Sequence, residues 1–397
     1  MYKADFPIFK TQKEPFVFLD TAASAQKPAV VIEAMSEMYK TNYANVHRGL
    51  YRLSDEASAA FEQARQTVAQ FIGAQSQDII WTRGATEAIN LVAYSFGQTL
   101  KAGDEIVVSV AEHHSNLVPW QVLREQKDVV LKFVPVLPNG LPNMQAYADS
   151  LTPKTKLVAM THMSNVLGTV FPIEEMIKQA HQVGAKVLID GTQSIVHRPV
   201  NVARMGCDFF VFSGHKLYGP TGIGVLYAPQ ALMNTLPPYQ TGGQMIKTVT
   251  LEKTTYAESP ARFEAGTPPI VEAIGLAKAI DYVKSIGWDK IQKHEERISA
   301  LLMQTLADCP FVEPLGALAE KKGLVAFNVK GVHAYDVGTF LGMSGVAVRE
   351  GLHCAEPLAR AFKVPGSVRV SLGLYNDEED IKALERALLK LKKVYAL

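Results

Sequence analysis

Two side chains near the middle of the chain have the chemistry and the spacing needed to hold an aldehyde cofactor. Lys216 follows an apolar strand predicted over Asp208–Ser213, and Asp190 ends a strand predicted over Lys186–Asp190. Ligands of α/β sheets bind beyond the carboxyl ends of the strands, so the two side chains are expected to converge. A lysine can form a Schiff base, and a carboxylate can keep a pyridine nitrogen protonated. Taken singly, they would be a surface lysine and a helix cap, but together they indicate pyridoxal phosphate.

A phosphate group also has a candidate site. The segment Ile79–Ala93 predicts a strand, a glycine turn and a helix that begins near Ala85. Thr86 falls in the first helical turn, where backbone N–H groups and a hydroxyl can bind an anion, although the same residues would also cap a helix. The glycines of Ser213–Gly224 match neither of the usual nucleotide-binding loops. Three strand-end features in one chain therefore favour a phosphate-bearing cofactor over coincidence.

Other polar side chains follow predicted strands. His113 can stack on a flat ring and move a proton, although a lone histidine is more often structural. The amides of Asn165 and Gln193 can bond to the phenolic oxygen of such a ring. These three residues extend the predicted site along the same edge of the sheet.

Cys354 stands out among the three cysteines because it lies in a Gly-containing segment without apolar periodicity, beside Arg349 and His353. A free cysteine is usually a small buried hydrophobe, which is how we interpret Cys207 and Cys309. A reactive thiolate instead needs a positive and partly exposed setting. Cys354 is therefore a candidate nucleophile.

The pattern along the chain predicts the elements that position these residues. The 397 residues, 48% of them hydrophobic and 20% charged, are typical of a globular protein with two domains. Short apolar strands alternate with helical patterns, which predicts an α/β fold with a mainly parallel sheet covered on both faces. We expect a large α/β domain over 16–270, and a smaller α+β domain that combines 1–15 with 271–397 and carries the cysteine loop. Asn376 is the expected N-cap of the last helix.

Several classes of function are disfavoured. A net charge of +1 argues against nucleic acid as a partner, and no apolar run is long enough for a membrane span or a signal peptide. The three cysteines have no metal-ligand spacing, so no metal is expected. Free thiols favour a reducing, cytoplasmic location.

In their order along the chain, seven motifs resemble the class V aminotransferase family, which has the aspartate aminotransferase-like fold (fold type I) of pyridoxal-phosphate-dependent transferases. They are RGATEAIN, EHHSN, SNVLGT, DGTQS, SGHKLYGPTGIGVLY, RFEAGTP and the arginine-to-HCA segment that ends at Ala355. More narrowly, the chain resembles the group II, SUF-type cysteine desulfurases, with selenocysteine lyases close by. The likeness extends from Phe18–Pro28 to Arg369–Asn376.

The resemblance implies a role for each matching position. Lys216 would carry the cofactor, Asp190 would pair with its ring nitrogen, His113 would stack on the ring, and Cys354 would take the sulfur. The other implied roles are phosphate binding by Thr86, Ser213, His215 and, from the other subunit, Thr267; contact with the phenolic oxygen by Asn165 and Gln193; and substrate binding by Arg369, Arg349, Asn45, His47 and Arg48.

The resemblance also implies a reaction and partners. A homodimer would convert L-cysteine to L-alanine and pass a persulfide from Cys354 to an acceptor of SufE or SufU type for iron–sulfur cluster assembly. Selenocysteine lyase and cysteine sulfinate desulfinase are alternative activities, and a non-catalytic sulfur carrier or scaffold would lack the cofactor. The chain departs from the family pattern at Glu350 and Leu352, and at Gln240 and Thr241. A carboxylate close to Cys354 would discourage thiolate formation.

Overall fold

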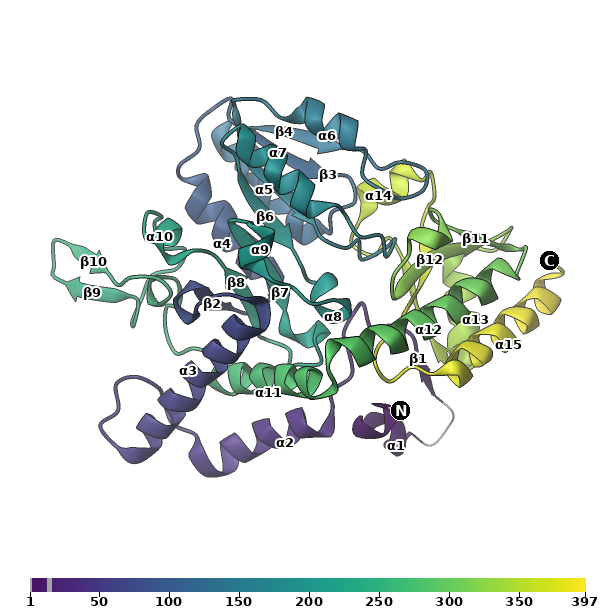
Figure 1. Cartoon of the computed structure of the whole chain (residues 1–397), viewed down its shortest axis with the longest axis horizontal. Coiled ribbons are helices and arrows are strands. Elements are labelled where there is room, and N and C mark those ends of the chain that lie inside the picture. Colours follow the sequence, from purple (N-terminus) through teal and green to yellow (C-terminus); the bar gives the residue numbers. More distant parts are fainter. Residues whose placement is uncertain (1, 13–15) are drawn as a thin grey trace.

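A seven-stranded sheet lies at the centre of the larger part of the computed structural model, which describes residues 2–12 and 16–397 (Figure 1). The strand order is β2-β8-β7-β6-β5-β3-β4. β8 runs antiparallel to both neighbours, and the remaining pairs are parallel, which confirms the predicted mainly parallel sheet. The strands are β2 (Ile79–Thr82), β3 (Glu105–Ser109), β4 (Val130–Val134), β5 (Thr155–Thr161), β6 (Lys186–Asp190), β7 (Phe209–Ser213) and β8 (Gly224–Tyr227).

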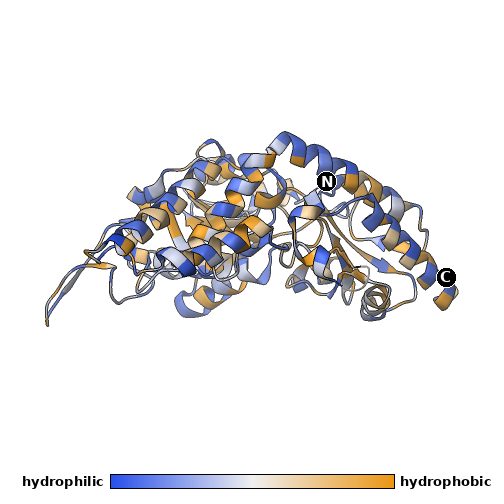
Figure 2. Ribbon diagram, turned by 90° about the horizontal axis from the view of Figure 1, so that it is seen from below, coloured by the Kyte–Doolittle hydropathy of each residue, from blue (hydrophilic) through white to orange (hydrophobic). Residues whose placement is uncertain are grey.

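Helices cover both faces of this sheet, so the strands read as continuous apolar runs. In β7, Phe209 and Val211 join the core on the side of α4 and α5, whereas Phe210 and Phe212 join the core that contains α3, α7 and α11. Figure 2 shows the apolar residues gathered between the layers. These helices are α3 (Arg52–Ile72), α4 (Ala85–Gly97), α5 (Val118–Lys127), α7 (Ile173–Gln182) and α11 (Ile270–Ile286).

A second, antiparallel sheet has the order β11-β12-β15-β14 and lies beside α12, α13 and α15 (Figure 1). Its residues and those of the three helices share a separate apolar core. The elements are β11 (Val312–Pro314), β12 (Leu324–Val329), β14 (Arg349–Gly351), β15 (Ser367–Ser371), α12 (Trp288–Ala307), α13 (Ala334–Met343) and α15 (Glu378–Tyr395).

Shorter elements lie within these two parts and between them. The β9–β10 hairpin projects from the larger one (Figure 1). β1 pairs in parallel with β13 beside the smaller sheet. These elements are α1 (Ile8–Thr11), β1 (Val17–Phe18), α2 (Ala29–Glu37), α6 (Met144–Ser150), α8 (Ser194–His197), α9 (Val202–Met205), α10 (Gln230–Met233), β9 (Ile246–Val249), β10 (Thr254–Tyr256), β13 (Val346–Ala347) and α14 (Glu356–Ala361), with short turns at η1 (Tyr2–Asp5), η2 (Met38–Asn42), η3 (Ser76–Asp78), η4 (His114–Asn116), η5 (Gly214–Lys216), η6 (Ala261–Phe263) and η7 (Leu318–Glu320).

The last helix begins one residue later than expected. Asp377, not Asn376, is the N-cap, because its carboxylate accepts from the backbone N–H of Asp380 and the Asp380 side chain caps in return. Asn376 instead donates to the backbone oxygen of Phe18 at 2.9 Å, which attaches this corner to the N-terminal segment.

We propose a division of the chain into two domains, with the boundary moved to the junction of α11 and α12. α11 follows the expected boundary at residue 270, yet it packs on α2 and α3 and its buried residues belong to a core of the large sheet. The other expected boundary, between 15 and 16, borders residues 13–15, which lie outside the described residues, as does residue 1. Within the described ranges, none of the helices combines the length and apolarity that crossing a bilayer requires.

Candidate active site

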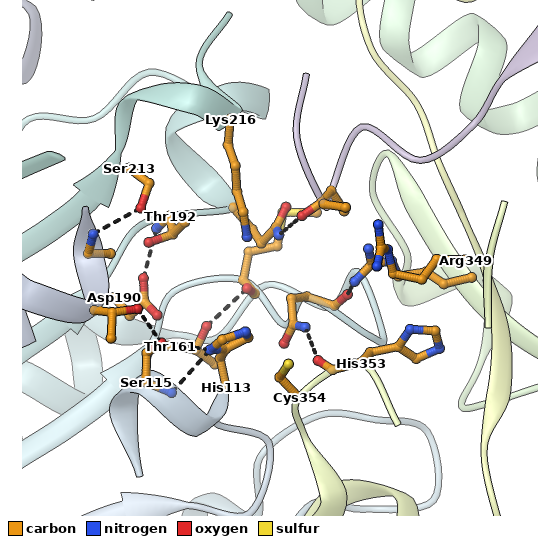
Figure 3. Close-up of a pocket in the computed structure, with 18 of the residues that line it drawn as sticks. His113, Ser115, Thr161, Asp190, Thr192, Ser213, Lys216, Arg349, His353 and Cys354 are labelled. Atoms are coloured by element: carbon orange, nitrogen blue, oxygen red, sulfur yellow. Dashed lines mark hydrogen bonds between the residues drawn. The ribbon is translucent and has the colours of Figure 1, made fainter. Parts of the chain in front are cut away.

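A cavity of about 510 Å³ lies where the ends of the large sheet's strands meet the smaller sheet (Figure 3). Lys216, Asp190 and His113 line it from the large sheet, while Cys354 and Arg349 line it from the other side. The remaining lining residues are Ala22, Ala23, Ala85, Thr86, Ser115, Thr161, Met163, Asn165, Thr192, Gln193, Ser213, His215, Glu350, His353 and Arg369.

Lys216 is placed by β7, which ends at Ser213 and is followed by the single turn η5. Burial of the ammonium group, and then the positive charge of Arg369, lower the pKa of Lys216 to about 8, while the Asp190 carboxylate opposes this shift. A minority of the amine, far larger than for an ordinary lysine, is therefore neutral near physiological pH, as a nucleophile or base requires.

Asp190 ends β6 and is buried, with Oδ1 accepting from the backbone N–H of Thr192 at 2.9 Å. Beneath it, Glu112 is fully buried and accepts from the Ser109 hydroxyl at 2.5 Å and from the Asn116 amide at 2.6 Å. Burial raises the pKa of Glu112 to about 8, so this carboxyl is mostly protonated at neutral pH. Asp190 therefore has a neutral neighbour.

His113 is held at Nδ1 by residues of the same short turn. The backbone N–H of Ser115 donates to Nδ1 at 3.1 Å, and the Ser115 hydroxyl lies 3.0 Å from the same nitrogen and 2.6 Å from the Thr86 hydroxyl. Burial, followed by the charge of Lys216, lowers the pKa of His113 to about 4. The ring is therefore neutral at physiological pH, and the bond at Nδ1 assigns its hydrogen to Nε2.

The first turn of α4 approaches strand β8 at contact distance. The Ser213 hydroxyl accepts from the backbone N–H of Ala85 at 2.9 Å. Gly224 permits the approach, because a Cβ there would lie 2.4 Å from Cα of Gly84. This brings Thr86 and the open N–H groups of the helix to the cavity wall, where an anion can bind.

The cysteine loop adopts an unusual backbone conformation. His353 and Cys354 both have left-handed dihedral angles, with φ of 52° and 54°. Two bonds from the large-sheet side hold the loop: Asn165 Nδ2 donates to the His353 backbone oxygen at 2.8 Å, and the His114 backbone N–H donates to that of Cys354 at 2.7 Å. The Cys354 side chain is exposed at the rim of the cavity.

The other two cysteines are buried in apolar cores, Cys207 with the large sheet and Cys309 with the smaller one. Burial raises the pKa of both thiols. Of the three thiols, only that of Cys354 opens to the cavity.

Two arginines bring positive charge to the rim of the cavity. Arg369, on β15, is buried and donates to the backbone oxygen of Asn165 at 3.0 Å. Its Nε is buried and finds no hydrogen-bond partner among residues 2–12 and 16–397. Arg349, on β14, is half-exposed and forms an ion pair with Asp20 at 2.8 Å. Both guanidinium groups suit a carboxylate ligand.

Glu350 lines the cavity, and its carboxylate lies against α13, where a Cβ added at Gly338 would lie 2.9 Å from Oε2. β14 thus directs Arg349 and Glu350 to opposite sides, as alternation along a strand requires. Leu352 is partly exposed beside the loop.

Four of the predicted site residues lie away from this cavity within the single chain. Thr267 lines a separate hollow of about 480 Å³ with Arg83 and Gln240. His47 and Arg48 line a smaller one of about 170 Å³ in the segment before α3, and Asn45 belongs to the same segment.

The remaining predicted residues line the cavity, and two of their side chains also form hydrogen-bond contacts with the segment Ala22–Ser24. Gln193 donates to the Ala22 backbone oxygen at 3.0 Å, and the His215 ring lies 3.2 Å from the Ser24 hydroxyl. Among the polar residues that were not predicted, Thr161 and Thr192 line the cavity, Ser115 lines it and contacts His113, and Asp20 and Glu112 support it from behind. Asp20 lies in the segment Phe18–Pro28, and Glu112 and Ser115 lie in the motif EHHSN, but nothing in these motifs marks them as site residues.

Comparisons with known proteins agree with this geometry. The family model described as aminotransferase class-V matches residues 17–384. The chain belongs to this family. It is 47% identical to a cysteine desulfurase of Salmonella agona, over 99% of this chain and 98% of that protein.

Two solved structures share the whole fold. The apo cysteine desulfurase of Thermococcus onnurineus is 38% identical with a TM-score of 0.94, covering 98% of this chain and 97% of that one. The Escherichia coli cysteine desulfurase CsdA, in an S-sulfonic acid form, is 37% identical with a TM-score of 0.92, covering 99% and 98%. Family membership confirms the predicted fold, the enzyme class and pyridoxal phosphate as the cofactor.

The residues of the cavity fit this cofactor. A lysine with a lowered pKa and a buried carboxylate face the same space, and the start of α4 supplies donors for a phosphate. The Thr192 hydroxyl is buried without a hydrogen-bond partner among the described residues, so it is a donor that a ligand can satisfy. The arrangement suits a flat, anionic and electrophilic group.

Proposed function

We propose that the chain is a group II, SUF-type cysteine desulfurase, which converts L-cysteine to L-alanine and retains the sulfur on Cys354. The observation that carries the proposal is the exposed Cys354 thiol at the rim of the cavity that Lys216 and Asp190 line. A desulfurase needs an amine base and a separate sulfur nucleophile within reach of one substrate, and this cavity offers both.

The cofactor would be held by residues of the large sheet. Lys216 would bind the aldehyde carbon, Asp190 the ring nitrogen, His113 the ring face, and Asn165 and Gln193 the phenolic oxygen. Pyridoxal phosphate, when bound, supplies an electron sink for a carbanion at the substrate α-carbon. The phosphate would be held by Thr86, Ser213 and His215 at the start of α4 and the end of β7.

The chain's own groups divide the remaining tasks. Arg369 would bind the substrate carboxylate through its free Nε–H, which fixes the α-carbon relative to Lys216. The neutral fraction of the Lys216 amine would remove the α-proton at Nζ and return a proton later. His113, with hydrogen at Nε2, would donate into the cavity.

Sulfur transfer would follow at Cys354. The Cys354 thiolate forms a bond to the substrate sulfur while the bond between that sulfur and the β-carbon breaks. The electron pair stays with the three-carbon product, which takes up a proton to become alanine, and a persulfide remains on Cys354. An exposed rim position then allows the sulfane sulfur to pass to an acceptor of SufE or SufU type for iron–sulfur cluster assembly.

A homodimer would complete the site. Thr267, Asn45, His47 and Arg48 lie outside the cavity of their own chain, so a second copy would supply Thr267 to the phosphate and the others to the entrance. Exposed apolar side chains near these positions support an interface, among them Tyr43, Leu50 and Tyr51. Three free thiols support a cytoplasmic location.

The Cys354→Ser variant tests the proposal. We expect it to lose release of alanine and persulfide from L-cysteine while it keeps the cofactor absorbance, because the serine hydroxyl cannot accept sulfur. Cys309→Ala is the matched control, since that thiol is buried in the smaller core. Alanine production at the normal rate by Cys354→Ser would contradict the assignment. Parallel rates on selenocysteine and cysteine sulfinate measure substrate preference.

A further inference from the structure

Asp20 is a buried carboxylate that binds both arginines of the cavity. Arg349 Nε lies 3.1 Å from each carboxylate oxygen, and Arg349 Nη2 donates to Oδ2 at 2.8 Å. Arg369 Nη2 donates to Oδ1 at 3.3 Å. Asp20 follows β1 and bridges to Ser371 at the end of β15, so it reaches the arginines from a third segment. Asp20 has no part in the catalytic and binding roles proposed for the other residues of the cavity.

The two arginines differ in which of their guanidinium donors are already hydrogen-bonded. Arg369 is 3% exposed and keeps Nε unbonded within the described chain, so it can still bind a carboxylate. Arg349 is half-exposed at the rim, and its Nε and Nη2 are both directed at Asp20. The bond from Asp20 raises the pKa of Arg349, and the charge of Cys354 adds to this shift, which places Arg349 within electrostatic range of the sulfur nucleophile.

The charges of this cluster match a substrate with one carboxylate. Two guanidinium groups and one carboxylate leave a single net positive charge, which a cysteine carboxylate neutralises. An amino acid with a second anionic group on its β-carbon, such as a sulfinate or a carboxylate, would need a second cation near Cys354. Arg349 is in the place to provide it, but Asp20 already binds its Nε and Nη2 and offsets its charge.

We propose that Asp20 is a positioning residue that sets the charge specificity of the cavity. By binding Arg349, it leaves Arg369 as the cation for the substrate and disfavours amino acids that carry a second negative charge at the β-carbon. The inference rests on the proposed function, because it concerns the substrate of the same cavity.

The test compares ligands that bind without sulfur chemistry. Dissociation constants of L-alanine and L-aspartate are measured by calorimetry on the holoenzyme of the wild type and of Asp20→Asn. We expect Asp20→Asn to strengthen the binding of L-aspartate relative to L-alanine, so that the ratio of the two dissociation constants changes by about fivefold. This is the size expected for an ion pair at a half-exposed guanidinium. The relative rate on cysteine sulfinate against cysteine should move in the same direction.

The double variant Asp20→Asn/Arg349→Gln restores one net positive charge, so its binding ratio should return toward the wild-type value. A purely structural Asp20 would change thermal stability without changing the ratio. An unchanged ratio in a folded Asp20→Asn protein, or a double variant that keeps the shifted ratio, would overturn the inference.

A second variant covers the case in which Asp20→Asn does not fold. Arg349→Gln alone lowers the net charge of the cluster to zero and should weaken aspartate relative to alanine. An unchanged ratio in this folded variant also overturns the inference. If the wild type bound both ligands but made no alanine from cysteine, the proposed function would fail while the charge argument stood.

Discussion

The two sides of the cavity are built in different ways. On the large-sheet side, Asp190, Lys216 and His113 follow the ends of buried parallel strands within a few residues. On the other side, Cys354 lies on an exposed loop with two successive left-handed residues. Groups that stabilise a developing charge must be preorganised on rigid elements. A thiol that transfers sulfur to another molecule must be accessible to it. The contrast therefore follows the division of the proposed chemistry.

The loop conformation is held by its contacts. A non-glycine residue in the left-handed region costs on the order of 1 kcal/mol, and here two occur in succession. Hydrogen bonds to the backbone oxygens of His353 and Cys354, and from the His353 ring to Ser367 at 3.0 and 3.1 Å, offset this cost. The cysteine is thus accessible, but its backbone is anchored to the large-sheet side.

The largest expected effect concerns the large-sheet side. Lys216→Ala should lower alanine production from cysteine by roughly 10⁴-fold, because it removes both the attachment point and the base. After borohydride reduction of the wild type, peptide mapping should find the pyridoxyl group on Lys216. The internal control is Lys321, another buried amine whose pKa burial lowers to about 8. A pyridoxyl group on Lys321 instead of Lys216 would show that the lysine of the large-sheet side does not hold the cofactor.

An intermediate effect concerns the anchor between the two sides. Asn165→Ala removes the bond to the His353 backbone oxygen and should lower the sulfur-transfer rate about tenfold by loosening the loop. Alkylation of Cys354 by iodoacetamide should become faster. Gln193→Ala is the matched control, since its amide donates to Ala22 and not to the loop. Equal alkylation rates in both variants would mean that the loop does not depend on this anchor.

The smallest effect on activity accompanies an acid dependence of stability that both sides share. Burial lowers the pKa of His162, behind β5, and of His353, in the loop, to about 3. The unfolded chain binds these protons below its ordinary pKa of about 6.5, so the stabilisation is full above that pH and is lost as the pH falls toward 3.

Urea unfolding at about pH 7.5 and about pH 5 should show a loss of about 2 kcal/mol per histidine. His162→Asn and His353→Asn should each reduce this pH dependence. A variant that unfolds with the same pH dependence as the wild type would show that the mutated histidine is not buried in neutral form. Alkylation of Cys354 ahead of global unfolding would show that the two sides open separately.

The strands and the site residues that lie at strand ends or in motifs could be predicted from the sequence. The strand predicted over Asp208–Ser213 is observed over Phe209–Ser213, and Asp190 and Lys216 follow from their places at or just after the ends of apolar runs. The structure brings both side chains into one cavity. The roles assigned to these residues stay predictions until they are tested by substitution.

Contacts between distant segments could not be predicted. Asp20 and Arg369 are 349 residues apart, and no local pattern relates them. The left-handed angles of His353 and Cys354 could not be predicted either, because only a few per cent of non-glycine residues adopt them and no local pattern marks these two. The position of α11 beside α2 and α3 depended on packing that periodicity does not encode. The N-cap shift from Asn376 to Asp377 reflects two capping residues in succession.

The hydrogen bond from the His114 backbone to the Cys354 backbone joins the two sides through one peptide group. His113 directly precedes that peptide, so a displacement of the cysteine backbone would also displace the backbone next to the His113 imidazole. If Cys354 and His113 have the roles proposed above, a partner bound at the cysteine would therefore reach the cofactor side of the cavity through the backbone, without contact with the cofactor.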